Sequence, residues 1–573
     1  MIDATHKTRA LIVLTCVSLA FTALGGRLVQ LHLFRHTDLS AQAAANQQLV
    51  VQRQGRRGEI RDCTGNLLAN SQSVRIVCAD PSITASNAVV TAAKLAPLLK
   101  MDVITLQAKL SGAGQYVRLK PKVDEETIQQ IKALKIKGLV FEDQYLRSYP
   151  HGALASHVIG FVDAEHKGVQ GIESAMDSYL AGVTGYEVIE RDRKGREIRA
   201  LREEGIEPRD GYHVVLTIDQ VIQHVAETEL DKAMAEFRPQ AGVIIVSRTK
   251  TGEILAMSSR PTFDLSNPGT ASADARRNRC ISDVAEPGST FKIVVCSGAL
   301  NDGIVRLSDQ FDCHNGAFLY AGRILHDAHP YGILPVEGIL YKSSNIGAAV
   351  VALKMGQGRL YEYIRRFGFG RKTGIGLPGE VSGIAHPLAK WSGLSITRIP
   401  MGHEIAVTPL QMMMAMNAIA NGGKLMKPII VKRVVNAEGR AVLENGPQQV
   451  AQCISPGTTA LMTTALRRVA TPDGTAPKAA VDGYDVAGKT GTAQKIEGGQ
   501  YVRKYYSSFI GYLPAADPEI SILVSLDDPS GAAYYGGTVS GPVFQRVASK
   551  VVEYLGLPPT KPLTDSKQVA SAR

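Results

Sequence analysis

The first strong pattern along the chain is an uncharged apolar run near its N-terminus. Residues 10–26 carry no charge, Lys7 and Arg9 precede them, and the apolar pattern continues beyond the run. A single membrane-spanning helix needs about 20 residues, so residues 10–34 are predicted to form one transmembrane helix and its extension. A cleaved signal peptide is the alternative, since residues 23–25 resemble a small-residue cleavage site. The continuing apolar pattern favours retention of the span.

Positive charge before the span predicts its orientation. Because Lys and Arg are retained on the cytoplasmic side, residues 1–9 are predicted to be a cytoplasmic tail. The expected localisation is therefore the inner (cytoplasmic) membrane, with a single pass and with the folded part of the chain on the periplasmic or outer side.

Beyond the span, the pattern divides the chain into two regions, 45–210 and 211–557. In the first region short strand-like runs alternate with helical periodicity, and no set of reactive side chains gathers. The expected elements are strands near residues 58–60 and 73–78 and helices near residues 89–99 and 125–134. A run of charges at residues 191–197 predicts a solvated hairpin or linker.

The second region begins and ends with strand patterns. Asp219, a preferred N-cap residue, follows a strand at 212–217 and precedes a helix with apolar positions at helical spacing. Further strands are expected at residues 242–246, 254–257, 507–512 and 520–526, and a closing amphipathic helix at residues 543–555. The first and last segments are expected to share one antiparallel sheet around an inserted helical block, which is an α+β fold. Residues 558–573 hold three prolines and few large apolar side chains, and are predicted to be disordered.

Length and charge narrow the class of protein. A chain of 573 residues exceeds what one core supports, so two or more domains are expected. The formal net charge of +11 suits a polyanion partner, but lysines and arginines are interleaved with acids along the whole chain. We therefore expect a solvated basic surface and no nucleic-acid binding.

The seven cysteines and thirteen histidines indicate neither a metal site nor a fixed disulfide pattern. Cys296 is predicted to be a buried free thiol, while pairing of Cys63 with Cys78 stays open because connectivity cannot be read from sequence. The histidines near the expected site lack metal-ligand spacing, so we predict no metal and no cofactor. These histidines are His326, His329 and His403.

Three short motifs follow one another in the second region. They are Ser289-x-x-Lys292, Ser343-x-Asn345 and Lys489-Thr490-Gly491-Thr492. Each alone is common by chance, but the set in this order is typical of β-lactamases and penicillin-binding proteins. With the flanking segments, the chain resembles a class B penicillin-binding protein. The flanking segments are residues 57–62, 147–150, 286–290, 402–409 and 489–493.

The first motif predicts a nucleophile beside a base. Pro287 and Gly288 break the chain before Ser289, and mostly apolar residues follow, so Ser289 is expected at the N-terminus of a buried helix with Lys292 on the same face. Lys292 can take the serine proton only as a neutral amine, and burial and the charge of Lys489 would both lower its pKa. A buried lysine paired with an acid is the alternative interpretation.

In the second motif alternate residues can point into one cleft, with Ser344 facing away. The alternative is an ordinary N-cap before the next helix. By resemblance, Ser343 relays a proton toward the leaving amine and Asn345 binds the substrate amide.

The third motif predicts a strand along which a peptide can lie, because Gly491 has no side chain. Lys489 and Thr490 offer donors to a terminal carboxylate. By resemblance, the backbone amides of Ser289 and Thr492 form the oxyanion hole.

Three further features are expected to be structural or peripheral. The methionine-rich residues 411–416 are predicted to lie in the core, and Trp391, the single tryptophan, to pack near the cleft. Residues 534–537 follow the Lys489 strand and could line the pocket.

The resemblance implies a peptidoglycan D,D-transpeptidase with a transmembrane helix, an extended pedestal (dimerisation-like) domain and a penicillin-binding, serine β-lactamase-like transpeptidase domain. Its partners would be stem peptides, β-lactams, a multispanning glycan polymerase and other division proteins in the membrane. Overall size and the compact loops of the first domain favour the division (septal) type over the elongation type. The motifs also leave open a membrane-bound β-lactam hydrolase or sensor and a non-catalytic division scaffold.

Overall fold

The computed structural model describes residues 4–114, 116–190, 205–531 and 533–563, and it has the predicted α+β composition. The chain divides into two compact units. One unit comprises Met1–Arg56 and Gly182–Asp210, and the other comprises Arg57–Ala181 and Gly211–Arg573. The predicted charged hairpin at residues 191–197 and most of the predicted disordered tail lie outside the described residues.

The first unit holds the apolar helix and a small sheet. Helix α1 (Ala4–Val29) continues through a π-helical turn (Gln30–Phe34), and the two together are long and apolar enough to cross a membrane, with a mean hydropathy of 1.9. This helix confirms the apolar element predicted for residues 10–34. Helix α2 (His36–Gln47) leads into an antiparallel sheet of order β1-β6-β7. Its strands are β1 (Gln48–Arg53), β6 (Gly185–Glu190) and β7 (Gly205–Ile206).

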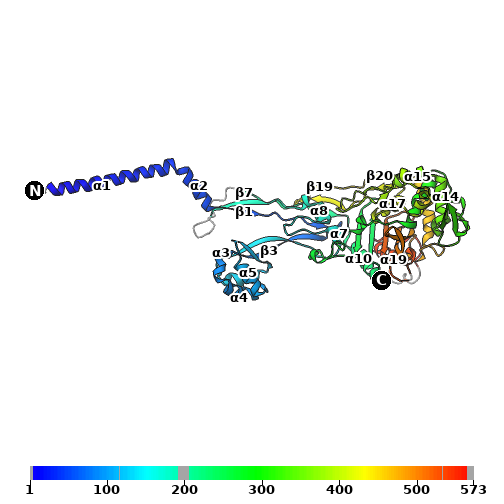
Figure 1. Ribbon diagram of the computed structural model, residues 1–573, viewed down its shortest axis with the longest axis horizontal. Coiled ribbons are helices and arrows are strands. Elements are labelled where there is room, and N and C mark those ends of the chain that lie inside the picture. Colours follow the sequence, from blue (N-terminus) through cyan, green and yellow to red (C-terminus); the bar gives the residue numbers. More distant parts are fainter. Residues whose placement is uncertain (1–3, 115, 191–204, 532, 564–573) are drawn as a thin grey trace. The chain divides into compact units, whose positions relative to one another are not determined.

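The second unit begins with a long strand pair backed by short helices (Figure 1). The helices pack their apolar faces together in one small core, and Asp102 and Asp124 cap two of them through bonds to backbone amides. The helices predicted near 89–99 and 125–134 are confirmed, whereas the predicted strand at 73–78 begins earlier. The elements are β2 (Ile60–Arg61), β3 (Leu67–Ala79), α4 (Ala88–Leu99), α5 (Val103–Leu110), β4 (Val117–Val123), α6 (Glu125–Ala133) and β5 (Leu139–Ser148).

This first part of the unit shares a sheet with the part that follows. Strand β2 pairs in parallel with β8 (His213–Leu216), with Ile60 opposite Val214. The sheet order is β19-β18-β8-β2-β3-β4, with β5 on β3, and it crosses the sequence boundary expected near residue 210. The remaining strands are β18 (Val431–Val435) and β19 (Ala441–Glu444).

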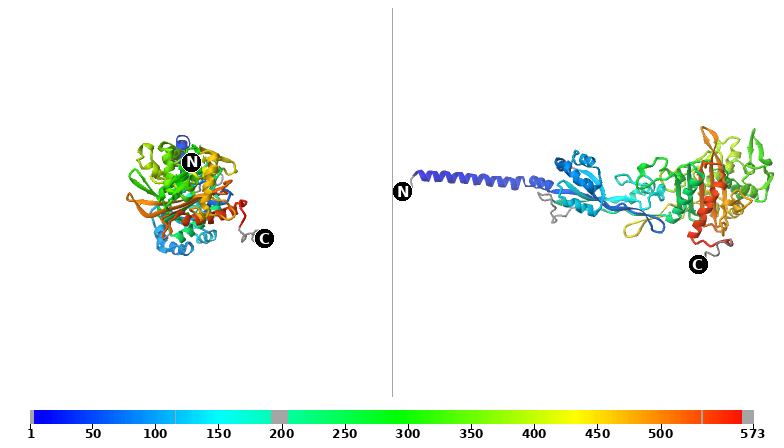
Figure 2. Two further views of the ribbon diagram at one scale, coloured as in Figure 1. Left: turned by 90° about the vertical axis from the view of Figure 1, so that its right-hand side faces the viewer. Right: turned by 90° about the horizontal axis from the view of Figure 1, so that it is seen from below.

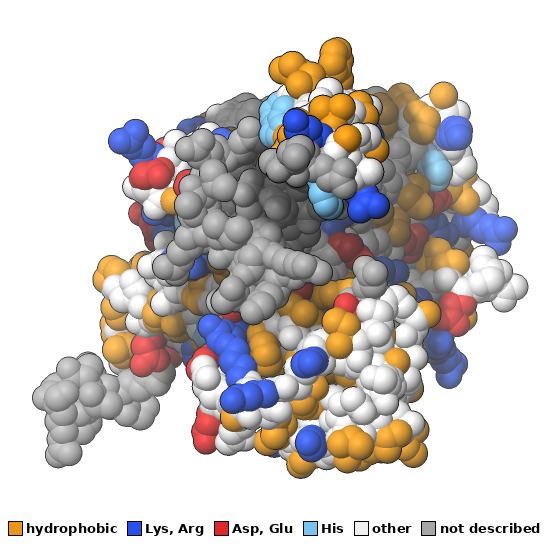
Figure 3. Space-filling view, turned by 90° about the vertical axis from the view of Figure 1, so that its left-hand side faces the viewer, with side chains coloured by type: hydrophobic (Ala, Val, Ile, Leu, Met, Phe, Trp, Pro, Cys, Tyr) orange, Lys and Arg blue, Asp and Glu red, His pale blue; other side chains and the backbone are white. Residues whose placement is uncertain are grey.

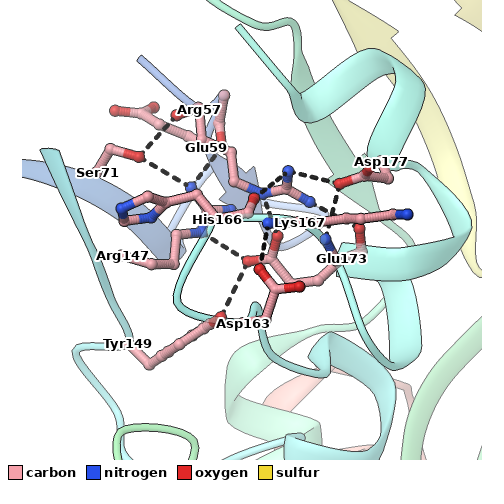
Figure 4. Close-up of polar contacts among 12 residues, drawn as sticks. Arg57, Glu59, Ser71, Arg147, Tyr149, Asp163, His166, Lys167, Glu173 and Asp177 are labelled. Carbon is pink, nitrogen blue, oxygen red and sulfur yellow. Dashed lines mark hydrogen bonds and ion pairs between the residues drawn. The ribbon is translucent and has the colours of Figure 1, made fainter. Parts of the chain in front are cut away.

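A buried ion network joins the two arginine motifs of the first part (Figure 4). Glu173, fully buried on α8 (Gly171–Ala175), accepts from Arg57 Nε and from Arg147 Nε, each at 2.6 Å. Arg57 Nη1 also lies 2.6 Å from Asp177 Oδ1, and the hydroxyl of Tyr149 donates to Glu173 Oε1 at 3.3 Å. Both motifs could be picked out in the sequence. Their shared partner Glu173 could not, because it lies more than twenty residues away from either motif.

Glu173→Gln is expected to destabilise this part of the protein by about 3–5 kcal/mol, because it removes the counter-charge of the buried Arg147 and leaves Arg57 with Asp177 alone. Urea unfolding of the full-length protein in detergent measures the change. Glu126→Gln, on the exposed face of α6, is the matched control. Equal stability of the two variants would contradict the assignment of Glu173 to the centre of the network.

A second sheet of the unit has five antiparallel strands in the order β10-β9-β23-β22-β21. This order confirms that the strands predicted at residues 242–246 and 254–257 share one sheet with the last strands of the chain. The first strand of the region, predicted at 212–217, was wrongly included: it is β8 and belongs to the sheet described above. Helices α10 and α19 cover one face, and Figures 1 and 2 show α19 along strands β22 and β23. The elements are α10 (Gln220–Phe237), β9 (Ala241–Arg248), β10 (Ile254–Arg260), β21 (Ala487–Glu497), β22 (Gln500–Leu513), β23 (Ile520–Asp527) and α19 (Gly536–Tyr554).

The opposite face of this sheet carries the helical block. Helix α17 (Pro409–Ala420) is buried along its whole length, which confirms the core interpretation of its methionines. Asp219 caps α10 as predicted, accepting from Val221 N at 2.9 Å and from Ile222 N at 3.2 Å. The other long helices of the block are α12 (Lys292–Asn301), α13 (Val336–Lys342), α14 (Asn345–Met355), α15 (Gln357–Arg366) and α18 (Pro456–Arg467).

The cysteines are unpaired, and basic side chains are dispersed over the face of the molecule in Figure 3. All seven cysteines are free, so Cys63 and Cys78 are not paired, and Cys296 is buried as predicted. On the face shown in Figure 3, lysine and arginine side chains are scattered among apolar, neutral and acidic ones. This distribution agrees with a solvated basic surface.

Candidate active site

The three sequence motifs meet in one cleft of about 840 Å³. Its walls come from the 3₁₀ turn η5 (Gly288–Phe291), the junction of α13 with α14, and the edge strand β21. Residues from all three motifs line it, and they are Ser289, Ser343, Asn345, Thr490 and Thr492.

Ser289 is held in the turn directly before α12 rather than in the first turn of the α-helix, as the sequence had suggested. Gly288 has a φ of +56°, and a Cβ at this position would lie 3.2 Å from the Thr492 carbonyl oxygen. A glycine is therefore needed for the turn to pass this close to β21. The close approach brings Ser289 and the strand to the same side of the cleft.

Lys292 is completely buried beneath the serine. Its Nζ lies 2.8 Å from Ser289 Oγ, 2.6 Å from the Ser343 carbonyl oxygen and 2.7 Å from Asn345 Oδ1. Burial lowers the pKa of Lys292 to about 7, against an opposing effect of the Asp327 charge. Lys489 was expected to lower this pKa as well, but burial is the main cause. No carboxylate pairs with Lys292 among the described residues, which argues against the ion-pair alternative.

Acylation of the protein by penicillin is expected to become faster as pH rises through about 7, because only the neutral Lys292 amine can take a proton from Ser289. Below this pKa the amine is charged and the rate falls, whereas above it the rate levels off. Second-order acylation rates measured from about pH 5.5 to 9 test whether the rate rises with pH. A rate that stays flat or falls across this range would contradict it.

Ser343 connects the two buried lysines. It follows α13 in a left-handed conformation, and its Oγ lies 2.9 Å from Lys489 Nζ and 3.2 Å from Lys292 Nζ. Burial and the charge of Lys292 hold the pKa of Lys489 well below its usual range. A hydroxyl between two amines can accept a proton from one neighbour while it donates its own elsewhere.

Both interpretations of the Ser-Ser-Asn motif are correct. Ser344 points away from the cleft and caps α14, accepting from Gly347 N at 2.9 Å, while Ser343 and Asn345 face Lys292. Sequence reasoning missed Asp327, whose carboxylate accepts from the Ser344 hydroxyl at 2.6 Å and from the backbone N–H of Asn345. An aspartate in a loop seventeen residues before Ser344 gives no local signal of this contact.

Strand β21 forms the long wall of the cleft. Among the described strands it pairs only with β22 and ends the sheet, so its other edge offers backbone groups to an extended ligand. Thr490 Oγ1 lies 2.9 Å from Thr475 Oγ1. At Gly491 a Cβ would clash with Ser508 Oγ and lie 3.0 Å from the Pro287 carbonyl oxygen. Contacts within the protein therefore already exclude a side chain at Gly491, before any ligand is considered.

Aromatic residues form the outer rim. The rings of Tyr505 and Tyr534 stack at 4.0 Å and those of Tyr534 and Tyr535 at 4.5 Å, and all three line the cleft. Residues 534–537 therefore line the pocket as the sequence suggested. Trp391 is a packing residue, as predicted: it contacts the core and packs edge-on against Tyr361 at 6.1 Å. It is not among the cleft-lining residues that the structure describes.

The histidines serve separate roles. Across the described residues no three His, Cys, Asp or Glu side chains gather in a way that could hold a metal ion. The His326 carbonyl oxygen accepts from Asn345 Nδ2 at 3.0 Å, whereas His329 and His403 line the cleft.

The chain matches two family models. Residues 242–549 match "Penicillin binding protein transpeptidase domain", and residues 52–216 match "Penicillin-binding Protein dimerisation domain".

Curated relatives match over most of their length. The chain is 32% identical over 512 residues to the probable peptidoglycan D,D-transpeptidase PenA of Neisseria meningitidis, covering 89% of this chain and 86% of that protein. It is 31% identical over 560 residues to the peptidoglycan D,D-transpeptidase FtsI of Escherichia coli (strain K12), covering 96% and 92%.

Solved structures match over a similar extent. A peptidoglycan synthetase from Bifidobacterium adolescentis has a TM-score of 0.73 at 29% identity, covering 90% of this chain and 98% of that one. Penicillin binding protein 3 from Mycobacterium tuberculosis, complexed with aztreonam, has a TM-score of 0.69 at 28% identity, covering 90% and 99%.

Proposed function

This chain belongs to the class B penicillin-binding proteins, and from that premise we propose that the cleft around Ser289 is its catalytic centre. The enzyme is a serine-type peptidoglycan D,D-transpeptidase. The observation that carries the assignment of the site is the 2.8 Å contact between Ser289 Oγ and the buried Lys292 Nζ.

The contacts of Lys292 favour its role as the base. A neutral amine has two N–H groups, and the Ser343 carbonyl oxygen and Asn345 Oδ1 are placed to accept both. The lone pair then remains for the hydroxyl proton of Ser289. As this proton moves to Lys292, Ser289 Oγ bonds to the carbonyl carbon of the D-Ala-D-Ala bond and the carbonyl electrons move to oxygen.

Collapse of the tetrahedral intermediate breaks the C–N bond and releases D-alanine. The leaving nitrogen receives the hydroxyl proton of Ser343, which regains a proton from Lys292. In this proposal the backbone amides of Ser289 and Thr492 stabilise the oxyanion. Thr490 and Lys489 bind the terminal carboxylate, and Gly491 keeps the strand close to the Ser289 turn.

The second half of the reaction transfers the acyl group. An amine from a neighbouring stem peptide attacks the ester on Ser289 and forms the cross-link. β-Lactams would acylate the same serine, which makes the protein a target of these drugs. Support comes from the M. tuberculosis relative, which was solved with aztreonam.

We propose the division of the chain into the five parts that the sequence predicts. They are a cytoplasmic tail (1–9), a transmembrane helix with its extension (10–34), a pedestal (45–210), a transpeptidase domain (211–557) and a terminal tail (558–573). The apolar helix would anchor the protein in the inner membrane with the cleft on the outer side, as the charges before it favour. A multispanning glycan polymerase and other division proteins would bind the span and pedestal.

Septal cell-wall synthesis is the proposed cellular role, supported by the overall size of the chain and the short loops of the pedestal. Depletion of the protein in the bacterium that carries it is expected to give long undivided cells. Rounded, swollen cells would instead favour an elongation-type transpeptidase, and normal division with a Ser289→Ala variant would favour a non-catalytic scaffold.

A further inference from the structure

His403 lines the cleft but takes no part in the steps of the proposed reaction. It belongs to the segment 402–409, which contacts the residues before Ser289. Gly402 has a φ of +84°, and a Cβ there would clash with the backbone of Gly288. The loop therefore packs directly on the Ser289 turn, and the next residue, His403, lines the cleft beside the nucleophile.

His403 is fixed by two groups from different elements. Its Nδ1 lies 2.6 Å from the hydroxyl of Tyr501 on β22 and 3.2 Å from Glu286 Oε2. The Tyr501 hydroxyl donates to Glu286 Oε2 at 3.2 Å, and the backbone N–H of Glu404 donates to Glu286 Oε1 at 2.9 Å. Glu286 and His403 are both largely buried, with side chains 12% and 22% exposed. The carboxylate thus holds the tyrosine and the imidazole in one orientation.

These contacts decide where the imidazole carries its proton. A carboxylate can only accept, and the tyrosine has one proton to donate. Every contact is satisfied when Tyr501 donates to Glu286 and Nδ1–H of His403 donates to Tyr501. This tautomer leaves a lone pair on Nε2, which has no hydrogen-bond partner among the described residues.

Electrostatics keep this imidazole neutral. Burial, together with the nearby charges of Arg398 and Lys292, lowers the pKa of His403 to about 4. Burial also raises the pKa of Glu286. At neutral pH His403 therefore presents a neutral hydrogen-bond acceptor within the field of the catalytic lysine.

We propose that His403 Nε2 binds the acceptor amine and orients its lone pair toward the acyl carbon on Ser289. The inference rests on the proposed transpeptidase function and names the group that handles its second substrate. Ser343 and Lys292 can take one proton of the attacking amine, whereas its other N–H must be held while its lone pair stays free. A neutral nitrogen acceptor meets this need, and a cationic group would not.

Ser343, Lys292 and Ser289 carry the proton of the transfer step. The amine nitrogen bonds to the acyl carbon, and one of its two protons passes through Ser343 to neutral Lys292. Lys292 then gives this proton to Ser289 Oγ as the ester C–O bond breaks. The second N–H stays in the new amide, and His403 accepts a hydrogen bond from it without taking the proton.

The experiment compares two fates of one acyl-enzyme. An N-acyl-D-alanyl thioester donor acylates the full-length protein in detergent, with D-alanine as the acceptor amine, and chromatography gives the ratio of transfer product to hydrolysis product. His403→Phe keeps the ring and removes its nitrogens, and Tyr501→Phe removes only the hydroxyl that orients it. His224→Phe, at an exposed position on α10, is the matched control.

The transfer-to-hydrolysis ratio is expected to fall about tenfold in His403→Phe, as for one lost hydrogen bond, and less in Tyr501→Phe, while the control keeps the wild-type ratio. Two products that fall together at an unchanged ratio would show a merely structural role and overturn the inference. So would a wild-type protein that hydrolyses the donor without transfer. A wild-type protein that the donor does not acylate would instead refute the proposed function itself.

Discussion

Ser289→Ala is expected to abolish release of D-alanine from a D-Ala-D-Ala donor, with a loss of at least about 10⁴-fold. Alanine lacks the oxygen that would bond to the carbonyl carbon, and no covalent intermediate can form without it. The side chain lies at the base of the cleft between the Lys292 amine and β21, so its removal leaves the surrounding walls intact. Enzymatic detection of free D-alanine measures the loss.

Ser297→Ala is the matched control for this change. Ser297 is a buried serine on α12, the helix that follows the Ser289 turn, and its hydroxyl donates to the Val294 carbonyl oxygen at 3.2 Å. It is expected to keep activity near that of the wild type. Turnover by Ser289→Ala within about tenfold of this control would be incompatible with a serine acyl-enzyme.

Lys292→Arg is expected to slow acylation by penicillin about 10³-fold, the usual contribution of a general base. Arginine keeps the positive charge but stays protonated throughout the working pH range, so it cannot accept the Ser289 proton. The planar guanidinium also cannot reproduce the three contacts of a buried amine with Ser289, Ser343 and Asn345. Stopped-flow or quenched-flow acylation above neutral pH measures the rate.

Lys354→Arg, at an exposed position of α14, controls for the substitution itself and should acylate at the wild-type rate. If Lys292→Arg acylated as fast as this control, the neutral-amine role would be untenable. The charge of Lys292 would then matter more than its basicity.

Local patterns predicted most of the fold and the members of the site. The N-cap at Asp219, the buried methionine helix and the strands on either side of the helical block all follow from residue periodicity. Order and spacing of the three motifs were enough to predict that Ser289, Ser343 and Lys489 face one another. The structure places them within hydrogen-bond reach of Lys292 or of each other.

Contacts between distant segments could not be predicted. Asp327 meets the Ser-Ser-Asn motif, Glu173 meets two arginines, and His403 meets Tyr501 across 98 residues of chain. Their partners are fixed by tertiary packing, and nothing in the local sequence marks an acid or a histidine as one that will be buried. The pairing of β2 with β8 was missed for the same reason, because two short strands give no signal of their register.

Time-resolved intact mass of the full-length protein with penicillin tests the central claim most directly. A single adduct of the mass of the drug is expected, located by peptide mapping on the segment that contains Ser289, and it should persist after free drug is removed. An adduct that clears while hydrolysed drug accumulates would contradict a transpeptidase and favour a β-lactam hydrolase. An adduct on any other residue, or none, would contradict Ser289 as the nucleophile.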